Sequence, residues 1–399
     1  MKIALVFDGL QIGGIERVGA DYAKILCELG HNVTIINLMP QLNEMEKEFP
    51  KTCRFKHFYY PRMATVAQYA QLTKKGFLGT LVYLAAMVLM PTVSFAFKSI
   101  FKIKRLINND YDIMIAFSGH FNDLDFVARN FSNAKHKMCW LHGALYSYSL
   151  ISYGYMNLYN KINNLIVLVD DAQEECLMYN KNLKLNINKL YNPTFINKKV
   201  VNKTNVEKLK KKYGIFLLMV SRFEYPHKDQ YTVAKMLEII RTQYGANVDL
   251  VFVGTGPEEA NVKRFVSEFS IDVQKHIHFE GSKMNVQDYY NAAYMLVHAS
   301  VAGEGLPTIM IEALAYNLPM VVTDSKTGPR EILGENEYGL LCKVQNPIDM
   351  AKKVNSLLSN KNLYMNYKVK SKERLMDFSP EVIKQQLKDI VSKIGSDKE

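Results

Sequence analysis

Two acidic residues eight positions apart are the strongest candidates for binding chemistry in this sequence. Residues 294–298 predict a strand, and the loop that follows it contains Glu304. A helix is expected over 306–316, with Glu312 inside it. Carboxylates placed in this way can each hold a vicinal diol, one on a sugar ring and one on a ribose. A structural role for both acids is an equal alternative on this pattern alone, because helices with such glutamates are common.

The start of this expected helix suits an anion. Pro307 lies in its first turn, where the backbone N–H that proline lacks would have no hydrogen-bond partner within the helix. The backbone from Leu306 to Thr308 and the positive end of the helix dipole favour a negatively charged group such as a pyrophosphate. Gly305 removes a side chain where a ligand would press against the backbone.

Two cations follow the first expected strand in the second half of the chain. Residues 215–220 predict the strand, and Arg222 and Lys228 lie in the loop at its C-terminal end. Ligands bind at this end of the strands in open parallel sheets. Two cations can neutralise a departing diphosphate without a metal. The alternative is that both are solvated surface side chains.

Two pairs of glycines also follow expected strands. Gly13 and Gly14 come after the first strand and permit close approach of a phosphate or sugar, although a simple tight turn explains them equally well. They do not form G-x-G-x-x-G, so dinucleotide binding is not predicted. Gly254 and Gly256 could lie against a nucleotide base, and an ordinary turn is at least as good an explanation.

Two further polar signals are weaker. His142 follows an expected strand over 137–141 and could bind a sugar hydroxyl, although a lone histidine is more often structural. Asp123 and Asp125 have the D-x-D spacing of metal sites in some sugar transferases. They open an expected helix over 123–131, where acidic residues are favourable in any case, so no metal site is predicted.

Short apolar runs that alternate with helical patterns predict parallel α/β sheets throughout the chain. We expect two Rossmann-like domains, residues 1–196 and residues 197–379, with the last helix, 380–399, packing back on the first domain. The expected strands are 2–8, 32–38, 111–117, 137–141, 164–169, 215–220, 248–253, 277–279, 294–298 and 319–323. Helices are expected over 15–29, 229–242, 306–316 and 380–394.

Composition limits the partners and the compartment. The net charge of +11 favours an anionic partner, either nucleic acid, anionic lipid or a phosphate-bearing substrate, or reflects a basic background. No helix-turn-helix or aromatic-basic motif is found, so nucleic acid is not expected. The five cysteines lack C-x-x-C spacing, which predicts reduced cysteines and neither disulfides nor zinc. The first ten residues lack the features of a signal peptide, so a cytoplasmic location is expected.

One apolar segment does not fit the α/β pattern. Residues 77–97 contain no charge, and basic residues flank them, up to position 105. The length could span a bilayer. A single crossing would separate strands that belong to one sheet, and Pro91 interrupts the segment. A helix or hairpin in the membrane interface, with the basic residues of 77–105 on anionic headgroups, fits better. A buried core helix is the alternative.

Together these motifs resemble glycosyltransferase family 4, the glycosyl transferases group 1, a large group of retaining GT-B enzymes. The resemblance covers nearly the whole chain, and the order and separation of the motifs carry it. The matching segments are Gly13–Arg17, His142-Gly143, Asn192-Pro193, Ser221-Arg222, Lys228, Gly254–Pro257, Glu304–Pro307 with Glu312, Gly328–Ile332 and Tyr338–Leu341.

The resemblance implies a GT-B fold, with two Rossmann-like domains facing across a cleft. The N-terminal domain would bind the acceptor and the C-terminal domain the nucleotide-sugar. Glu304 would face the transferred sugar, which His142 would also contact. Glu312 would hold the ribose, and Arg222 and Lys228 the pyrophosphate.

The implied reaction is a retaining hexosyl transfer from a UDP-sugar, without metal or cofactor. The apolar segment favours a membrane-associated saccharide or lipid-linked acceptor in cell-surface polysaccharide or glycoconjugate biosynthesis, at the inner face of the cell membrane. A nucleotide-sugar 2-epimerase shares the fold, but residues 77–97 argue against it. A non-catalytic sugar-binding subunit is a third possibility, against which the intact cationic and acidic residues argue. Ala302-Gly303 is smaller than usual in the family, so the sugar pocket can differ in shape.

Overall fold

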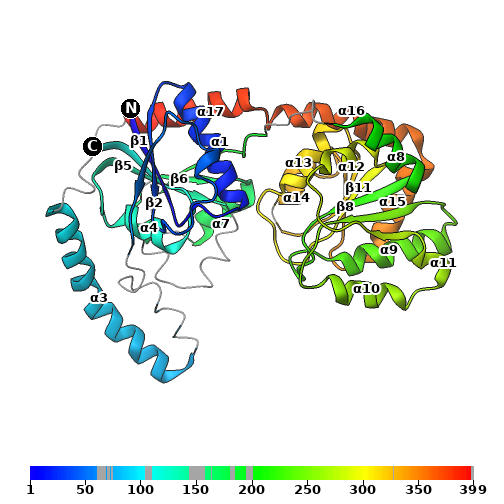
Figure 1. Ribbon diagram of the computed structural model, residues 1–399, viewed down its shortest axis with the longest axis horizontal. Helices are drawn as coiled ribbons and strands as arrows, with labels where there is room; N and C mark the ends of the chain where they lie inside the picture. The colour runs from blue at the N-terminus through cyan, green and yellow to red at the C-terminus, as the bar shows by residue number, and fades with distance from the viewer. Residues whose placement is uncertain are drawn as a thin grey trace. The chain divides into compact units, whose positions relative to one another are not determined.

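The computed structural model describes residues 1–60, 69, 72, 75–103, 110–142, 158–162, 164–179, 185–194, 201–326 and 328–396. The chain divides into two compact units (Figure 1). The first comprises Met1–Pro193 and Pro380–Glu399, and the second comprises Thr194–Ser379. Each contains a parallel sheet with helices, so the α/β class predicted from the sequence is confirmed.

The first unit contains a seven-stranded parallel sheet with the order β3-β2-β1-β4-β5-β6-β7. Its central strands are apolar runs buried on both faces, as is usual where helices cover a parallel sheet. The strands are β1 (Lys2–Phe7), β2 (Asn32–Asn37), β3 (Arg54–His57), β4 (Tyr111–Ala116), β5 (Ala134–Leu141), β6 (Asn164–Val167) and β7 (Asn186–Lys189). The helices are α1 (Gly14–Glu28), η1 (Glu46–Glu48), α3 (Phe77–Ile103), α4 (Phe121–Ala128), α7 (Asp170–Tyr179) and α17 (Pro380–Ser396).

Helix α17 returns the end of the chain to the first unit (Figure 1). Ile383, Leu387 and Val391 repeat every four residues along one face of the helix and are fully buried. On the exposed side, Lys384 forms an ion pair with Glu28 of α1 at 2.8 Å. Burial of each large aliphatic side chain contributes roughly 1.5–3 kcal/mol, so the apolar face rather than the ion pair anchors this helix.

Helix α3 leaves much of its apolar surface uncovered. Phe77, Val88 and Phe95 expose 78%, 73% and 71% of their surface, although Ala86 is buried. A buried core helix, one alternative for residues 77–97, does not fit these exposures. Within the described residues, no helix has the length and apolarity needed to cross a membrane.

The second unit contains a six-stranded parallel sheet with the order β10-β9-β8-β11-β12-β13. Its strands are β8 (Phe216–Val220), β9 (Asp249–Val253), β10 (Ile277–Phe279), β11 (Met295–His298), β12 (Met320–Thr323) and β13 (Leu340–Cys342). The helices are α8 (Lys203–Tyr213), α9 (Gln230–Gln243), α10 (Glu259–Ser267), α11 (Ile271–Gln274), α12 (Val286–Ala292), α13 (Thr308–Ala315), α14 (Gly328–Leu333), α15 (Pro347–Ser359) and α16 (Lys361–Met376).

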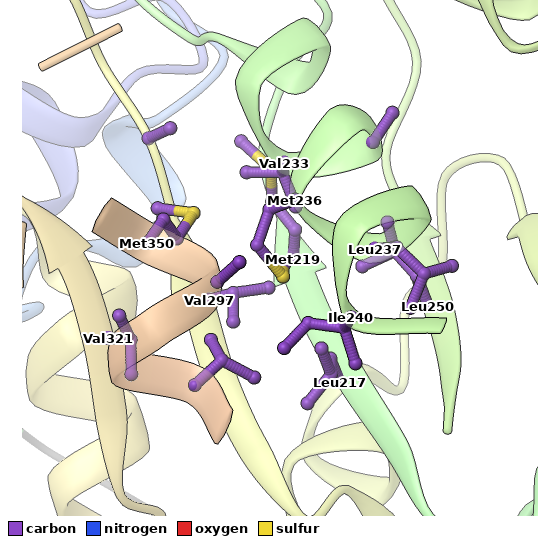
Figure 2. Close-up of a cluster of buried hydrophobic side chains, with 14 of the residues drawn as sticks. Leu217, Met219, Val233, Met236, Leu237, Ile240, Leu250, Val297, Val321 and Met350 are labelled. Carbon is purple, nitrogen blue, oxygen red and sulfur yellow. The ribbon is translucent and has the colours of Figure 1, made fainter. Parts of the chain in front are cut away.

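The core of the second unit joins helices α9 and α15 to one face of the sheet (Figure 2). Met219 of β8 and Val297 of β11 lie between Met236 of α9 and Met350 of α15, and all four are fully buried. This packing fixes β8 beside β11, although β8 ends at Val220 and β11 begins only at Met295. The loops after these two strands are therefore brought together by the core.

Each sheet has one point at which the strand order reverses. It lies between β1 and β4 in the first unit and between β8 and β11 in the second. Open parallel sheets bind ligands at the carboxyl ends of the strands on either side of such a point. The topology thus predicts a ligand-binding edge in each unit.

Candidate functional site

Two loops of the second unit are joined at the carboxyl ends of β8 and β11. The Asp229 amide donates to the Ala299 carbonyl at 2.9 Å. The amides of Val301 and Ala302 both donate to the Pro226 carbonyl, at 3.0 and 3.1 Å. These backbone hydrogen bonds hold the loop that carries Lys228 against the loop that carries Glu304.

Three side chains meet where the loops join. The Lys228 ammonium lies 2.5 Å from Glu304 Oε2. His298, the last residue of β11, places Nε2 2.8 Å from Glu304 Oε1. The same ring nitrogen lies 3.5 Å from the Lys228 Nζ. We call Lys228, His298 and Glu304 the switch-point cluster.

The cluster keeps its carboxylate ionised. Burial acts to raise the pKa of Glu304, but His298 and Lys228 outweigh it and lower the pKa to about 2. Burial lowers the pKa of His298, although Glu304 opposes that change. The imidazole is therefore neutral at pH 7, so its contribution to Glu304 is a hydrogen bond, while Lys228 supplies the charge.

The backbone of Glu304 is fixed as well as its side chain. Its amide donates to the Lys326 carbonyl at 3.1 Å, and its carbonyl accepts from the Gly328 amide at 3.0 Å. Position 328 requires glycine, because a Cβ there would lie 1.8 Å from the Gly305 carbonyl oxygen. Glycine at position 328 thus allows residues 326 and 328 to approach the loop of Glu304 closely enough to form these hydrogen bonds.

Helix α13 begins beside this loop, and Pro307 is its N-cap. The predicted helix over 306–316 is two residues longer at its start and one at its end, which is the usual uncertainty of helix ends. Glu312 lies in the second turn, facing Tyr290 of α12. Burial, together with the nearby Glu312 carboxylate, raises the pKa of the Tyr290 hydroxyl well above its usual value.

Arg222 has a fixed backbone and a largely free side chain. Gln230 is buried and donates to the Arg222 carbonyl at 2.9 Å and to Ser221 Oγ at 3.0 Å. The Arg222 guanidinium is 75% exposed and lies 3.3 Å from Glu224. Arg222 and Lys228 share one loop, but only Lys228 contacts Glu304 in this structure.

Gly254 and Gly256 press against the loop that carries Arg222. A Cβ at Gly254 would lie 2.0 Å from the Ser221 carbonyl oxygen, and the φ of Gly254 is +137°. A Cβ at Gly256 would lie 2.4 Å from the Phe223 carbonyl oxygen. Both glycines are therefore needed for the close packing of this loop, whether or not they also contact a ligand.

The remaining predicted residues belong to the first unit. Gly13 is the N-cap of α1, and Gly14 is its first residue. His142 directly follows β5, where its Nε2–H donates to the Phe117 carbonyl at 2.7 Å. Burial is the main reason that the pKa of His142 falls to about 4, so this imidazole is also neutral at pH 7. Gly143 lies outside the described residues.

The D-x-D pair has structural partners on α4. Asp123 is buried and accepts from the Gly119 amide at 2.8 Å. Asp125 forms an ion pair with Arg129 at 2.6 Å and accepts from the Tyr60 hydroxyl. Among the residues that the structure describes, no group of three or more His, Cys, Asp or Glu side chains is arranged to hold a metal ion.

Sequence reasoning missed the partners of the two predicted acids. His298 closes an apolar strand and Tyr290 lies in a short helix, and neither belongs to a motif. The one available signal is that His298 is the polar last residue of a buried strand, directly before the loop of Glu304. That signal indicates proximity to an edge but not which side chain the imidazole meets.

Comparisons with known proteins relate the chain to glycosyltransferases. Residues 201–374 match the family model of glycosyl transferases group 1. The chain is similar to an uncharacterized glycosyltransferase of Haemophilus influenzae, with 29% identity over 157 residues, which are 39% of this chain and 43% of the relative. It is also similar to the N-acetylgalactosamine-N,N'-diacetylbacillosaminyl-diphospho-undecaprenol 4-alpha-N-acetylgalactosaminyltransferase of Campylobacter jejuni, with 30% identity over 132 residues, 33% of this chain and 35% of the relative. In both cases the match spans less than half of the relative's length.

Solved structures resemble the chain over nearly its whole length. HepE of Anabaena, in complex with UDP and glucose, has a TM-score of 0.71 at 17% identity and covers 98% of this chain and 100% of its own. A glycosyltransferase from Rickettsia africae has a TM-score of 0.71 at 18% identity and covers 100% of this chain and 99% of its own. The GT-B fold predicted from the sequence is therefore confirmed.

Proposed function

We propose that this chain, which has the GT-B fold and carries a glycosyl transferases group 1 domain at residues 201–374, transfers a sugar from a UDP-sugar to a saccharide or lipid-linked acceptor. The switch-point cluster is the observation that carries the proposal. It places a buried, ionised carboxylate and an ammonium at the edge where parallel sheets bind ligands. A buried ion pair is weak evidence for stability alone, which favours a binding role.

The proposed division of labour follows from charge. Lys228, with the exposed guanidinium of Arg222 and the amides at the start of α13, neutralises the departing diphosphate. An ammonium has three donors, so Lys228 can turn one toward a phosphate oxygen without deprotonation. Glu304 accepts hydrogen bonds from the transferred sugar, and Glu312 accepts them from the ribose.

The transfer proceeds with retention and without metal in this proposal. The bond between the anomeric carbon and the β-phosphate oxygen breaks, and the acceptor hydroxyl oxygen bonds to that carbon from the same face. The hydroxyl proton passes to the leaving phosphate oxygen, so the reaction needs no base from the protein. Fixed cations that face the leaving group stabilise the negative charge that develops there.

The identities of donor and acceptor rest on the similar proteins. HepE was solved with UDP and glucose, which supports a UDP-linked donor. The Campylobacter jejuni relative is named for a diphospho-undecaprenol substrate, which supports a lipid-linked saccharide acceptor. An amylovoran biosynthesis glycosyltransferase of Erwinia amylovora, 27% identical over 44% of this chain and 48% of that relative, supports a role in polysaccharide synthesis.

Replacement of Glu304 tests the assignment directly. Glu304→Gln keeps the size of the side chain and removes its charge, so we expect UDP release in the presence of acceptor to fall by about 10²–10³-fold. Glu280→Gln is the matched control, since Glu280 also pairs with a lysine, Lys212, at 2.8 Å, but after the edge strand β10. Near wild-type turnover in Glu304→Gln contradicts the proposal. Isomerised donor that forms without acceptor would instead identify a 2-epimerase.

We further propose that the segment 77–105 docks on the inner face of the cell membrane. Exposed apolar side chains on α3 support this, and so does the exposed Lys75 just before the helix. Serine at Leu81, Val88 and Phe95 should reduce sedimentation with anionic vesicles while circular dichroism stays unchanged. Added salt should weaken binding of the wild type. Equal sedimentation of the triple variant and the wild type contradicts docking through α3.

A further inference from the structure

The side chain of His298 is fully buried at the end of β11. Its Nε2 lies 2.8 Å from Glu304 Oε1, while its Nδ1 is buried with no hydrogen-bond partner in the described part of the chain. The preceding strand residues are Met295, Leu296 and Val297, so an apolar residue would suit the position. A buried nitrogen without a partner is unfavourable, and it calls for a compensating role of the ring.

The hydrogen bond to Glu304 fixes the proton on the ring. A neutral imidazole has one N–H, and a carboxylate can only accept. The proton therefore lies on Nε2, and the imidazole donates to Oε1. Because the ring is fully buried, its N–H points in one direction and cannot turn toward a ligand.

The two oxygens of Glu304 consequently have different partners. Oε1 is held by the rigid His298, whereas Oε2 is held by Lys228, whose long side chain is 22% exposed. When Lys228 turns toward a phosphate, its contact with Oε2 is lost, whereas the contact of His298 with Oε1 remains. The histidine therefore keeps the carboxylate oriented when the lysine moves.

We propose that His298 is a positioning residue that holds Glu304 through Oε1, so that Oε2 can accept a hydrogen bond from a hydroxyl of the donor sugar. This inference rests on the proposed transferase function. It assigns to a core residue the task of orienting the carboxylate throughout the reaction, which neither the family match nor the sequence motif assigns.

Three substitutions separate positioning from packing. His298→Leu fills the space without a donor, and loss of such a supporting partner typically lowers activity by about 10–100-fold. His298→Gln can place an amide N–H near the position of Nε2, so it should recover much of the activity. His298→Asn is too short to reach Oε1 and should resemble His298→Leu. If His298→Leu does not fold, the comparison of His298→Gln with His298→Asn still distinguishes positioning from packing.

Two readouts distinguish orientation of Glu304 from general damage. UDP lacks the sugar, so its dissociation constant should be unchanged in His298→Leu while kcat falls. The acidic limb of the kcat/KM profile should move to higher pH in His298→Leu and return in His298→Gln, because Glu304 loses and regains a donor. His278→Gln is the control, since His278 contacts the carboxylate of Asp249 at 2.7 Å, on a different strand pair.

The outcomes also separate this inference from the proposed function. Full activity in Glu304→Gln would overturn the transferase assignment itself. A severe defect in Glu304→Gln together with wild-type kcat and an unmoved acidic limb in His298→Leu and His298→Asn would overturn only the positioning role. A fall in kcat with weaker UDP binding in both Gln and Asn variants would indicate packing damage and also overturn it.

Discussion

Two buried carboxyl groups, one at each switch-point edge, have opposite electrostatic environments. Glu304 follows β11 in the second unit, and an ammonium and an imidazole N–H surround it. Asp123 follows β4 in the first unit and is fully buried, with a backbone amide of Gly119 at 2.8 Å. Burial acts on both groups in the same direction, toward a higher pKa. The groups around each carboxyl therefore decide whether its pKa is lowered or raised.

The outcome for Asp123 is the reverse of that for Glu304. Burial, followed by the negative charge of Asp8, raises the pKa of Asp123 well above its usual value, and backbone hydrogen bonds only oppose this. Asp8 in turn accepts from the Asn122 amide at 2.8 Å. The second unit holds an ammonium beside the carboxylate at its edge, and this ammonium suits an anionic ligand. The first holds hydrogen-bonding groups, which suit hydroxyls.

The largest expected effect comes from removing the cation that sets Glu304 apart. Lys228→Met keeps the length of the side chain and removes its charge, so we expect kcat for sugar transfer to fall by about 10²–10³-fold. Arg222→Met should cost less, because the Arg222 side chain is 75% exposed and not held against Glu304. Steady-state kinetics with a UDP-sugar compares the two variants. Equal, small effects of the two substitutions would show that the contact with Glu304 does not set Lys228 apart from Arg222.

A smaller effect concerns the pH dependence of stability, where the two acids should have opposite signs. The folded-state pKa of Glu304, about 2, lies below the ordinary value of 4.5, so its ionised form stabilises the fold above pH 4.5. That contribution, on the order of 3 kcal/mol, is lost as the pH falls from about 5 to 2. The free energy of unfolding of the wild type should therefore approach that of Glu304→Gln over this range.

Asp123 should show the reverse trend. Its folded-state pKa is raised above the ordinary 3.8, so the ionised form costs stability at higher pH. The penalty is relieved as the pH falls through the raised pKa toward 3.8. The wild type should thus gain stability relative to Asp123→Asn on acidification, as measured by urea unfolding. Parallel trends for Asp123→Asn and Glu304→Gln would show that the two environments are not opposite.

The sequence predicts the fold well where strands are buried on both faces. The runs at 2–8 and 215–220 became β1 and β8 because a continuous apolar stretch has few other solutions in a parallel sheet. Three of the strands that the structure describes were missed. β3 and β7 are only partly buried and read RFKH and NINK, and β13 has three residues. Such strands take their conformation from the neighbour they pair with, which a local pattern does not record.

Local patterns predict the candidate site only as separate motifs, and it is the resemblance to glycosyltransferase family 4 that assigns them to one donor site. Lys228 and Glu304 are 76 positions apart, and their contact depends on β8 lying beside β11. Periodicity predicts that both strands exist but not their order in the sheet. His298 is hidden for a second reason, because its neighbours in sequence are core residues and its functional partner is a side chain in the next loop. The roles of these residues remain predictions.

The smallest expected effect concerns the histidine of the first unit, His142. Its Nε2–H donates to the Phe117 carbonyl, whereas that of His298 donates to a carboxylate. A neutral hydrogen bond contributes about 1 kcal/mol, less than one to a charged group, so His142→Phe should lower kcat/KM by roughly fivefold. The ring of phenylalanine can still stack on Trp140, which keeps the packing. Because burial lowers the pKa of His142 to about 4, the kcat/KM profile of this variant should match that of the wild type between pH 6 and 8. A loss as large as that of His298→Leu, or a changed pH profile in this range, would mean that His142 acts as a charged or proton-transferring group. The two edges would then resemble each other in their chemistry, despite the opposite pKa shifts of Glu304 and Asp123.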